Sequence, residues 1–220
     1  MIKIACVLKT GGEYTKEYVE NLYNAIRRNC FENFQFVCLN DIDNKVELSL
    51  LNDWPGWWSK IELFRLTGKV LYFDLDTIIL KDISNMVEIV NKLAENEFIG
   101  VKAFNPRRNL YEKTIFNSGV MGWNGDFKFI YDNFNFEKES NNPDKECIGD
   151  QDYISRELRS KKINIRFWQN EIVGLYSYKR HCKEGLPEDA RVVCFHGHPR
   201  PHQVVKEIDW VRDNWRDIRN

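Results

Sequence analysis

Two aspartates separated by a single residue are the side chains of this sequence best suited to bind a metal ion or to catalyse a reaction. Asp74 and Asp76 directly follow the apolar run 70–73, which predicts a β-strand. Side chains at positions i and i+2 of an extended chain point the same way, so the two carboxylates are expected to project together. Ligands of α/β sheets bind beyond the carboxyl ends of strands. A carboxylate pair there suits a hard divalent cation, which could bridge to a diphosphate and stabilise its charge as it leaves.

Other interpretations of these polar residues stay open. One aspartate could instead cap the next turn or helix while the other is solvated. His196 could be a histidine at a strand end whose ring has a structural partner. Cys194, His196 and His198 alternate along one segment and would share a face of a strand, as in a zinc site, but the sequence offers no obvious fourth ligand.

The elements that must position these residues alternate along the first part of the chain. Three apolar runs predict strands at residues 2–8, 34–39 and 70–73. Between them, apolar residues recur every three or four positions over 18–26 and 57–66, which predicts amphipathic helices. Strands alternating with helices favour an α/β fold with a mixed, mostly parallel central sheet flanked by helices.

The second half of the sequence is more mixed. Strands are predicted at 98–104, 119–123, 163–168 and 192–195, and helices at 150–159 and 207–218. The polar stretch 133–147 predicts a surface loop. Because neither repeats nor a linker interrupts these elements, we expect a single domain over residues 1–220.

Composition narrows the class of protein. The chain has 220 residues and a formal net charge of -1, which gives no reason to expect bulk attraction to nucleic acid or to an anionic membrane. Its apolar runs are too short for a membrane helix, and its first residues do not resemble a secretory signal. The six cysteines form no C-x-x-C pair, and several lie in apolar runs, which favours a reduced protein in the cytoplasm.

Several segments, in the order of the chain, resemble glycosyltransferase family 8, which includes glycogenin and bacterial galactosyltransferases. The match around Asp74 and Asp76 is to the metal-binding motif of that family. Further matches are Val7-Leu8-Lys9-Thr10 with Tyr14, Trp58-Ser59-Lys60-Ile61, Phe116-Asn117-Ser118-Gly119, Gly149-Asp150-Gln151-Asp152 and the region from Phe195 to Pro201. Each motif is loose, but together they extend from residue 2 to about residue 202.

The resemblance implies a GT-A fold, a Rossmann-like arrangement, and transfer of a hexosyl group from a nucleotide-sugar, a UDP-sugar, to a hydroxyl acceptor with retention. It implies a metal site of Asp74, Asp76 and His196, filled by Mn²⁺ or alternatively Mg²⁺; an imidazole ligand favours Mn²⁺. It places Asp150 and Gln151 beside the transferred sugar, although an amide is a poor nucleophile. The implied donor-binding residues are Leu8, Thr10, Tyr14, Lys60, Asp74, Leu75, Asn117, Ser118, Gly197 and Arg200.

The sequence departs from the family in places. Arg200 stands where the family has lysine, and it offers a planar fork instead of a point charge. His196 and Gly197 are adjacent, one residue closer than in glycogenin, which shortens the distance to Arg200. The acceptor is not predicted; a glycan, a protein, a small molecule or DNA would each supply a hydroxyl.

Two rival functions remain. A phosphatase of the haloacid dehalogenase superfamily would use Asp74 as nucleophile, but Thr77 follows Asp76 one residue too early for its motif. A domain that binds a sugar or nucleotide without turnover is the non-enzymatic alternative. The retained Asp74, Asp76, His196 and Asp150 favour catalysis over binding alone.

Overall fold

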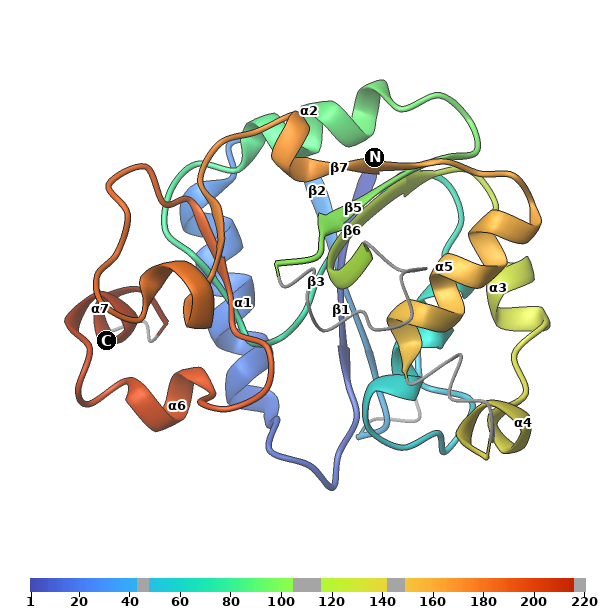
Figure 1. Ribbon diagram of the computed structural model, residues 1–220, viewed down its shortest axis with the longest axis horizontal. Coiled ribbons are helices and arrows are strands. Elements are labelled where there is room, and N and C mark those ends of the chain that lie inside the picture. Colours follow the sequence, from blue (N-terminus) through green and yellow to red (C-terminus); the bar gives the residue numbers. More distant parts are fainter. Residues whose placement is uncertain (43–47, 105–115, 142–148, 216–220) are drawn as a thin grey trace.

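A computed structural model of the chain describes residues 1–42, 48–104, 116–141 and 149–215. Its centre is a six-stranded sheet with the strand order β2-β1-β3-β6-β5-β7 (Figure 1). The strands are β1 (Ile2–Leu8), β2 (Phe34–Asn40), β3 (Val70–Phe73), β5 (Glu97–Lys102), β6 (Phe116–Asn124) and β7 (Ile165–Phe167).

The pairing of these strands makes the sheet mixed and mostly parallel. Strand β1 runs parallel to both β2 and β3, and β7 runs parallel to β5. Only β6 opposes its neighbours, since it pairs antiparallel with β3 and β5. The predicted fold class, α/β with a mostly parallel central sheet flanked by helices, is therefore confirmed. The carboxyl ends of β1 and β3 lie side by side, because Ala5 of β1 is in register with Tyr72 of β3.

A second, smaller sheet was not predicted as a unit. It consists of β4 (Thr77–Ile79), β9 (Val192–Cys194) and β8 (Leu175–Ser177), with β9 in the middle. Only β9 was expected; β4 and β8 lie outside the apolar runs that the sequence analysis assigned to strands. The sheet matters for the site because β4 begins directly after Asp76. The Phe195 amide donates to the Asp76 carbonyl at 3.1 Å, which brings the segment after β9 beside the end of β3.

Helices cover both faces of the central sheet. On one face lie α1 (Lys16–Asn29), α2 (Ser84–Lys92) and α7 (Asp209–Trp215), and on the other lie the 3₁₀ helix η1 (Gly56–Arg65), α3 (Phe129–Asp132) and α5 (Asp150–Ser160). Figure 1 shows α1 on one side of the sheet and α3 and α5 on the other. The shorter elements are α4 (Phe136–Ser140), η3 (Trp168–Asn170), η4 (Tyr178–Cys182) and α6 (Pro201–Val204).

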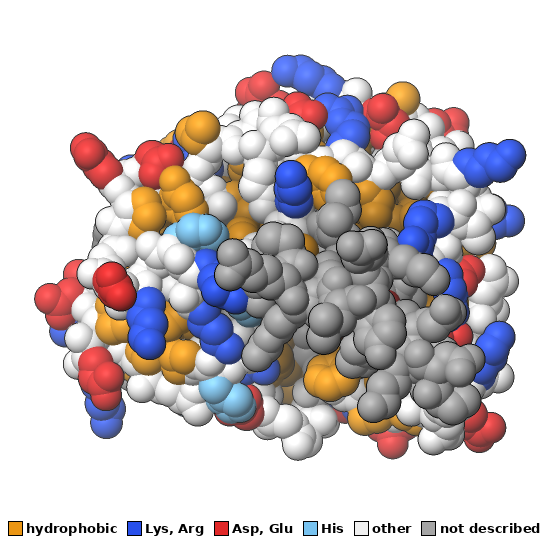
Figure 2. Space-filling model, viewed as in Figure 1, with side chains coloured by type: hydrophobic (Ala, Val, Ile, Leu, Met, Phe, Trp, Pro, Cys, Tyr) orange, Lys and Arg blue, Asp and Glu red, His pale blue; other side chains and the backbone are white. Residues whose placement is uncertain are grey.

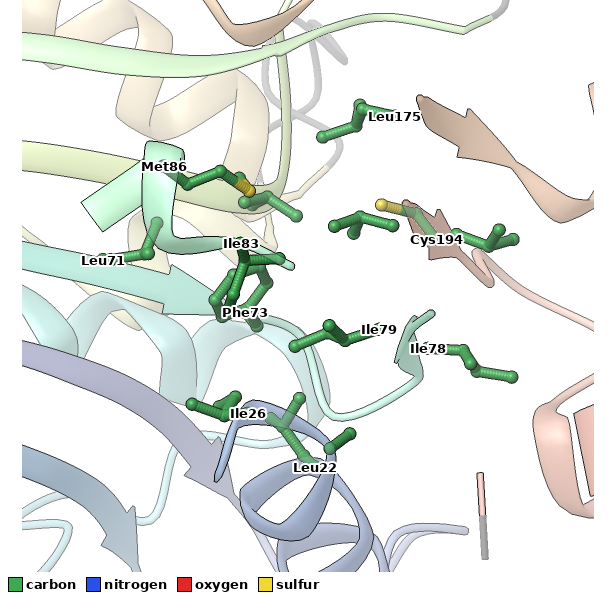
Figure 3. Close-up of a cluster of buried hydrophobic side chains, with 14 of the residues drawn as sticks. Leu22, Ile26, Leu71, Phe73, Ile78, Ile79, Ile83, Met86, Leu175 and Cys194 are labelled. Atoms are coloured by element: carbon green, nitrogen blue, oxygen red, sulfur yellow. The ribbon is translucent and has the colours of Figure 1, made fainter. Parts of the chain in front are cut away.

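Two hydrophobic cores result, one on each face. Along β1, Ile4 and Cys6 belong to the core under α1, whereas Ala5 and Val7 belong to the core under η1. This alternation follows from the two-residue period of a strand. Figure 3 shows the first core, where Leu22 and Ile26 of α1 meet strand residues of both sheets. The core thus holds the small sheet against the central one.

Some predicted elements differ in detail. The segment 57–66 forms a 3₁₀ helix, and the predicted loop 133–147 contains the short helix α4, while its residues 142–147 lie outside the described part of the chain. The predicted C-terminal helix 207–218 begins at Asp209, and its residues 216–218 lie outside the described residues. Cys147 also lies outside them. No helix among the described residues is long and apolar enough to cross a membrane. Acidic and basic side chains lie interspersed on the face shown in Figure 2.

Candidate functional site

One cavity at the carboxyl ends of β1 and β3 gathers nearly all the predicted site residues. Its volume is about 740 Å³, within the range of roughly 300–1,000 Å³ that is usual for small-molecule sites. The predicted residues that line it are Thr10, Tyr14, Lys60, Asp74, Leu75, Asp76, Asn117, Ser118, Asp150, Gln151, His196, Gly197 and Arg200. They come from six separate segments of the chain, which the two sheets bring together.

Leu8 is the exception among the predicted site residues. Its side chain is buried, 2% exposed, in the core under α1. Because side chains alternate along β1, it is Val7 that faces the other way and lines the cavity. The prediction for Leu8 is therefore corrected: its side chain contributes to packing, and Val7 borders the site.

A turn brings Asp74 and Asp76 together. We expected an extended chain at these residues, but the Thr77 amide donates to the Asp74 carbonyl at 3.0 Å, which closes a turn over 74–77. Both carboxylates nevertheless line the cavity. The simpler interpretation of a capping aspartate beside a solvated one does not fit, because the Asp76 side chain is buried and that of Asp74 is 30% exposed.

Asp74 belongs to a buried charge cluster with Lys60 and Asp150. The Lys60 ammonium lies 2.8 Å from Asp74 Oδ1, 3.0 Å from Asp150 Oδ2 and 3.0 Å from Ser118 Oγ. Ser118 Oγ donates to Asp150 Oδ2 at 2.5 Å, and the Tyr72 hydroxyl donates to Asp74 Oδ1 at 2.5 Å. The cluster links η1, the end of β3, β6 and the start of α5, so it fixes four segments at one point.

The charges in this cluster hold Lys60 in its cationic form. Burial alone would lower the pKa of Lys60, but the negative charges of Asp150 and Asp74 outweigh it and raise that pKa. Burial raises the pKa of Asp74, while Lys60 and the Tyr72 hydrogen bond oppose the rise. A lysine that stays charged inside a cavity is a fixed positive charge for an anionic ligand.

Asp76 makes a second set of contacts in the cavity, with Tyr14 and Arg200. The Tyr14 hydroxyl donates to Asp76 Oδ2 at 2.7 Å, and the Arg200 guanidinium forms an ion pair with the same oxygen. Burial and the charge of Asp74 raise the pKa of Asp76 to about 7, against the lowering effect of Tyr14 and Arg200. Arg200 also reaches Glu13 at 3.2 Å and lies over the Tyr14 ring, 5.0 Å from its centroid.

Whether these residues fit a metal ion depends on their donor atoms. Two carboxylates in one cavity are a donor set that a divalent cation accepts, with substrate phosphate and water as the remaining ligands. The predicted third ligand is not part of that set in this structure. His196 Nε2 lies 2.6 Å from Ser177 Oγ, and the ring stacks on Phe104. Among the described residues no three histidine, cysteine, aspartate or glutamate side chains are grouped to hold a metal ion, which also disfavours the zinc alternative.

The side chains predicted to contact a sugar also line the cavity, and we call this part of the lining its sugar end: Asn117, Ser118, Asp150 and Gln151. Asn117 Nδ2 lies 3.5 Å from Gln151 Oε1, and Asn117 Oδ1 accepts from the Gly119 amide at 3.0 Å. Asp150 is the first residue of α5, but Gly149 is the N-cap, and the Asp150 side chain turns to Lys60 and Ser118. The Asp150 side chain therefore points into the cavity and does not cap its helix.

Gly197 allows a close approach that another residue would not. Its φ is +66°, a left-handed conformation that favours glycine, and a Cβ there would lie 3.0 Å from Lys179 Nζ. The glycine therefore lets the segment after β9 turn beside the cavity.

Several residues of the site were missed by the sequence analysis. Lys9 lies 2.6 Å from Asp41 and 2.6 Å from Asp53, and Asp41 accepts from the Thr10 amide at 2.9 Å. Tyr72 and Ser177 each bond a predicted metal ligand. The position of Tyr72, two residues before Asp74 on the same strand, was a signal for its role; nothing in the sequence linked Asp41 or Ser177 to the site, since their contacts are long-range.

The fold of this chain is similar to that of solved glycosyltransferases. The galactosyltransferase LgtC, solved in complex with donor and acceptor sugar analogues, has a TM-score of 0.60 and 13% identity, over 90% of this chain and 88% of that chain. GlyE of Streptococcus pneumoniae TIGR4 also has a TM-score of 0.60, with 15% identity, over 91% of this chain and 56% of its own.

A glycosyltransferase involved in the glycosylation of the major capsid of PBCV-1 has a TM-score of 0.54 and 12% identity, over 92% of this chain and 96% of its own. No protein-family model matches the sequence, and no curated protein matches it. At such low identities the likeness concerns the fold, and the predicted GT-A-like fold is confirmed.

Proposed function

We propose that this protein is a metal-dependent glycosyltransferase that moves a hexosyl group from a UDP-sugar to a hydroxyl acceptor. The observation that carries the proposal is the cavity itself. On a fold similar to that of glycosyltransferases, it places Asp74 and Asp76 at the carboxyl end of β3, with Lys60 and Arg200 beside them. Carboxylates for a divalent cation and two basic side chains are what a diphosphate requires.

The diphosphate would lie at the Asp76 end of the cavity. When bound, Mn²⁺, or alternatively Mg²⁺, would be held by Asp74 and Asp76 and would neutralise the charge that develops on the leaving diphosphate. Arg200 would leave Asp76 for a phosphate, to which its guanidinium can donate two hydrogen bonds. His196 would join the metal only after exchanging its Ser177 partner, and Gly197 lets the neighbouring backbone approach.

The nucleoside would lie along the loop that follows β1. Thr10 is held in place because its amide and hydroxyl both donate to Asp41, at 2.9 and 2.8 Å. The Tyr14 ring, now covered by the Arg200 guanidinium, becomes available to a base once Arg200 moves to a phosphate. The choice of uridine rests on the resemblance of the sequence to family 8.

The hexosyl group would occupy the end of the cavity that Asn117, Ser118, Asp150 and Gln151 line. Their amide, hydroxyl and carboxylate groups can donate to and accept from sugar hydroxyls. Lys60 holds Asp150 and Ser118 in one arrangement, so this end is organised before the donor binds. Retention is proposed from the resemblance, with Gln151 stabilising the anomeric centre by its amide dipole.

A thermal-shift panel tests the proposal without an acceptor. Binding to the native state raises the melting temperature by mass action. We expect UDP to stabilise the chain more than GDP, ADP, TDP or CDP, and only with Mn²⁺ or Mg²⁺, not with a chelator. No shift with any nucleotide would contradict the proposal, and hydrolysis of a phosphate ester would then indicate the phosphatase.

A matched pair of variants assigns the metal to the carboxylates. Asp76→Asn should remove the metal-dependent part of the UDP shift, because a neutral amide is a poor ligand for a hard cation. Asp213→Asn, at an exposed aspartate outside the cavity, is the control. If Asp76→Asn retained the full shift, the site assignment would be wrong.

We also propose that the chain acts as one domain over residues 1–220 in the cytoplasm. Support comes from its five described cysteines, which are all free. Free, largely buried thiols are typical of a reducing compartment.

A further inference from the structure

Trp57 is exposed although it borders the cavity. Its side chain is 58% exposed, whereas the next residue, Trp58, is 6% exposed and lies in the core under η1. Among the described residues, the other large hydrophobic side chains that are exposed all lie outside the cavity; they are Met1, Phe31, Ile42, Leu51 and Val173. An indole exposed to water beside a polar cavity does not gain the favourable free energy of burying its apolar surface. A ligand that covers the ring would supply that free energy.

The indole is held at the sugar end of the cavity. A Cβ at Gly149 would lie 3.3 Å from Trp57 Nε1 and 3.6 Å from Cδ1, so the backbone of Gly149 lies close to the pyrrole edge of the ring. Gly149 directly precedes Asp150 and Gln151, which line the same cavity. The ring is therefore next to the carboxylate and the amide that would surround a transferred sugar.

The cavity thus has two chemically different ends. At one end Asp76, Arg200 and Glu13 form a network of charges. At the sugar end an exposed indole lines the cavity with Gln151, an uncharged polar side chain, and with the ion pair of Lys60 and Asp150. A flat apolar surface beside hydrogen-bonding groups matches a pyranose ring, which has C–H groups on its face and hydroxyls at its edge; the C–H groups pack on the electron-rich face of an indole.

We propose that Trp57 is the platform on which a pyranose ring of the acceptor stacks, so that the acceptor is a carbohydrate and not a protein side chain or DNA. This inference rests on the proposed glycosyl transfer. In that reaction an acceptor hydroxyl oxygen bonds to the anomeric carbon of the donor. The bond from that carbon to the diphosphate oxygen breaks, its electron pair stays on the nucleoside diphosphate, and the hydroxyl proton is released with that product.

The experiment titrates carbohydrates into the protein with saturating UDP and Mn²⁺. The probes are the methyl glycosides of glucose, galactose and N-acetylglucosamine and the disaccharides lactose and maltose, observed by saturation-transfer NMR and calorimetry. Trp57→Ala should weaken binding roughly tenfold, the effect of losing a favourable aromatic contact together with its buried area. Trp57→Phe should retain most of the affinity. Phe31→Ala, at an exposed aromatic residue outside the cavity, should bind as the wild type does.

The nucleotide titration of the same variants separates the two proposals. Trp57→Ala should lose more affinity for the carbohydrate than for UDP. An equal loss for both would overturn the inference, because Trp57 would then belong to the donor site. Unchanged carbohydrate binding in Trp57→Ala would overturn it too, as would wild-type protein that binds UDP with Mn²⁺ but no carbohydrate. If the wild type bound no nucleotide at all, the proposed function would fail, whatever the carbohydrate titration showed.

Discussion

Arg200 and Asp76 form an ion pair across the cavity, although they are 124 positions apart in the sequence. Arg200 lies after β9 and Asp76 lies in the turn after β3. The same guanidinium reaches Glu13 and lies over the ring of Tyr14, both in the loop that follows β1. One side chain therefore joins three segments. Its guanidinium brings to Asp76 a positive charge of the kind that a bound cation would also supply.

The role of Arg200 is tested by replacing it. Arg200→Ala should weaken binding of the UDP–Mn²⁺ pair roughly 10- to 100-fold, since a hydrogen bond between charged groups contributes about 1.5–3 kcal/mol. The UDP affinity of Arg200→Lys should lie between that of the wild type and that of Arg200→Ala, because lysine keeps the positive charge but lacks the planar fork of the guanidinium. Arg212→Ala removes a surface arginine from the end of the chain as a control. Calorimetry would contradict the assignment if Arg200→Ala and Arg212→Ala bound UDP equally well.

Lys60 should be a strong determinant of stability. Lys60→Met would leave the buried Asp150 and the partly exposed Asp74 without their cation, and an unpaired buried charge costs about 3–5 kcal/mol. For a chain of this size, roughly 2–4 °C of melting temperature correspond to each kcal/mol. Lys92→Met is the matched control, because Lys92 pairs with Glu88 on the exposed surface of α2.

The effect of Lys60→Met should also depend on pH. Without the lysine, which opposes the effect of burial, the folded-state pKa of Asp74 rises further, so the variant regains relative stability as pH falls and this carboxyl becomes protonated. Melting curves at pH 5 and pH 8 check this. If the melting temperature of the variant were lowered equally at pH 5 and pH 8, lost packing and not lost charge would destabilise it.

Metal-dependent nucleotide binding should weaken below neutral pH. Burial and the charge of Asp74 raise the pKa of Asp76 to about 7 in the metal-free chain, so the carboxyl is mostly protonated below that pH. A metal ligand must be deprotonated, and binding therefore releases a proton there. The affinity for UDP with Mn²⁺ should fall by up to about tenfold for each pH unit below 7.

Calorimetry in two buffers that differ in ionisation enthalpy measures the proton that is released at pH 6. Asp76→Asn should release fewer protons than the wild type, because the terminal phosphate of UDP is then the remaining source of a proton. An affinity that stays constant from pH 8 to pH 5.5 in the wild type would be incompatible with Asp76 as the titrating ligand.

A side chain at Gly197 should lower the stability of the protein. Gly197→Ala would place a residue at a φ of +66°, with its Cβ 3.0 Å from Lys179 Nζ. The left-handed conformation alone costs about 1–2 kcal/mol for alanine. Gly185→Ala, where the added Cβ meets nothing within 4 Å, should leave stability near that of the wild type. Equal melting temperatures for the two variants would show that the chain around residue 197 adopts another backbone.

The sequence was sufficient to predict the parts of the fold that repeat a local pattern. The strands β1 and β3 were predicted with their observed bounds, because each is an apolar run of sufficient length. The site followed from them, since residues placed after parallel strands meet at one edge of the sheet. The family-like motifs added Lys60, Asn117 and Asp150, which local chemistry alone would not have joined.

What the sequence did not predict depends on long-range contacts. Strands β4 and β8 have three residues each and are defined by their pairing with β9. Leu8 was assigned to the site by resemblance, but the alternation along β1 turns it into the core. The partners of the site residues, such as Ser177 with His196 and Glu13 with Arg200, are set by how the two sheets pack, a relation that no local spacing encodes.

Gln151 should matter more to turnover than to donor binding. Its amide oxygen lies 3.5 Å from Asn117 Nδ2 at the sugar end of the cavity, and the ion pair of Asp76 and Arg200 is formed by other segments of the chain. If its dipole stabilises the positive charge that develops at the anomeric carbon, Gln151→Ala should lower the rate of UDP-sugar hydrolysis roughly a hundredfold, the usual scale for one oriented dipole.

The affinity for UDP in the same variant should change little, because UDP carries no hexosyl group to contact residue 151. Gln169→Ala, a glutamine that bonds the backbone of Lys102, serves as control and should hydrolyse the donor as the wild type does. An effect of Gln151→Ala on KM alone would assign the residue to binding the sugar. An effect on kcat with KM unchanged would place its interaction in the transition state, because only such an interaction accelerates the chemical step.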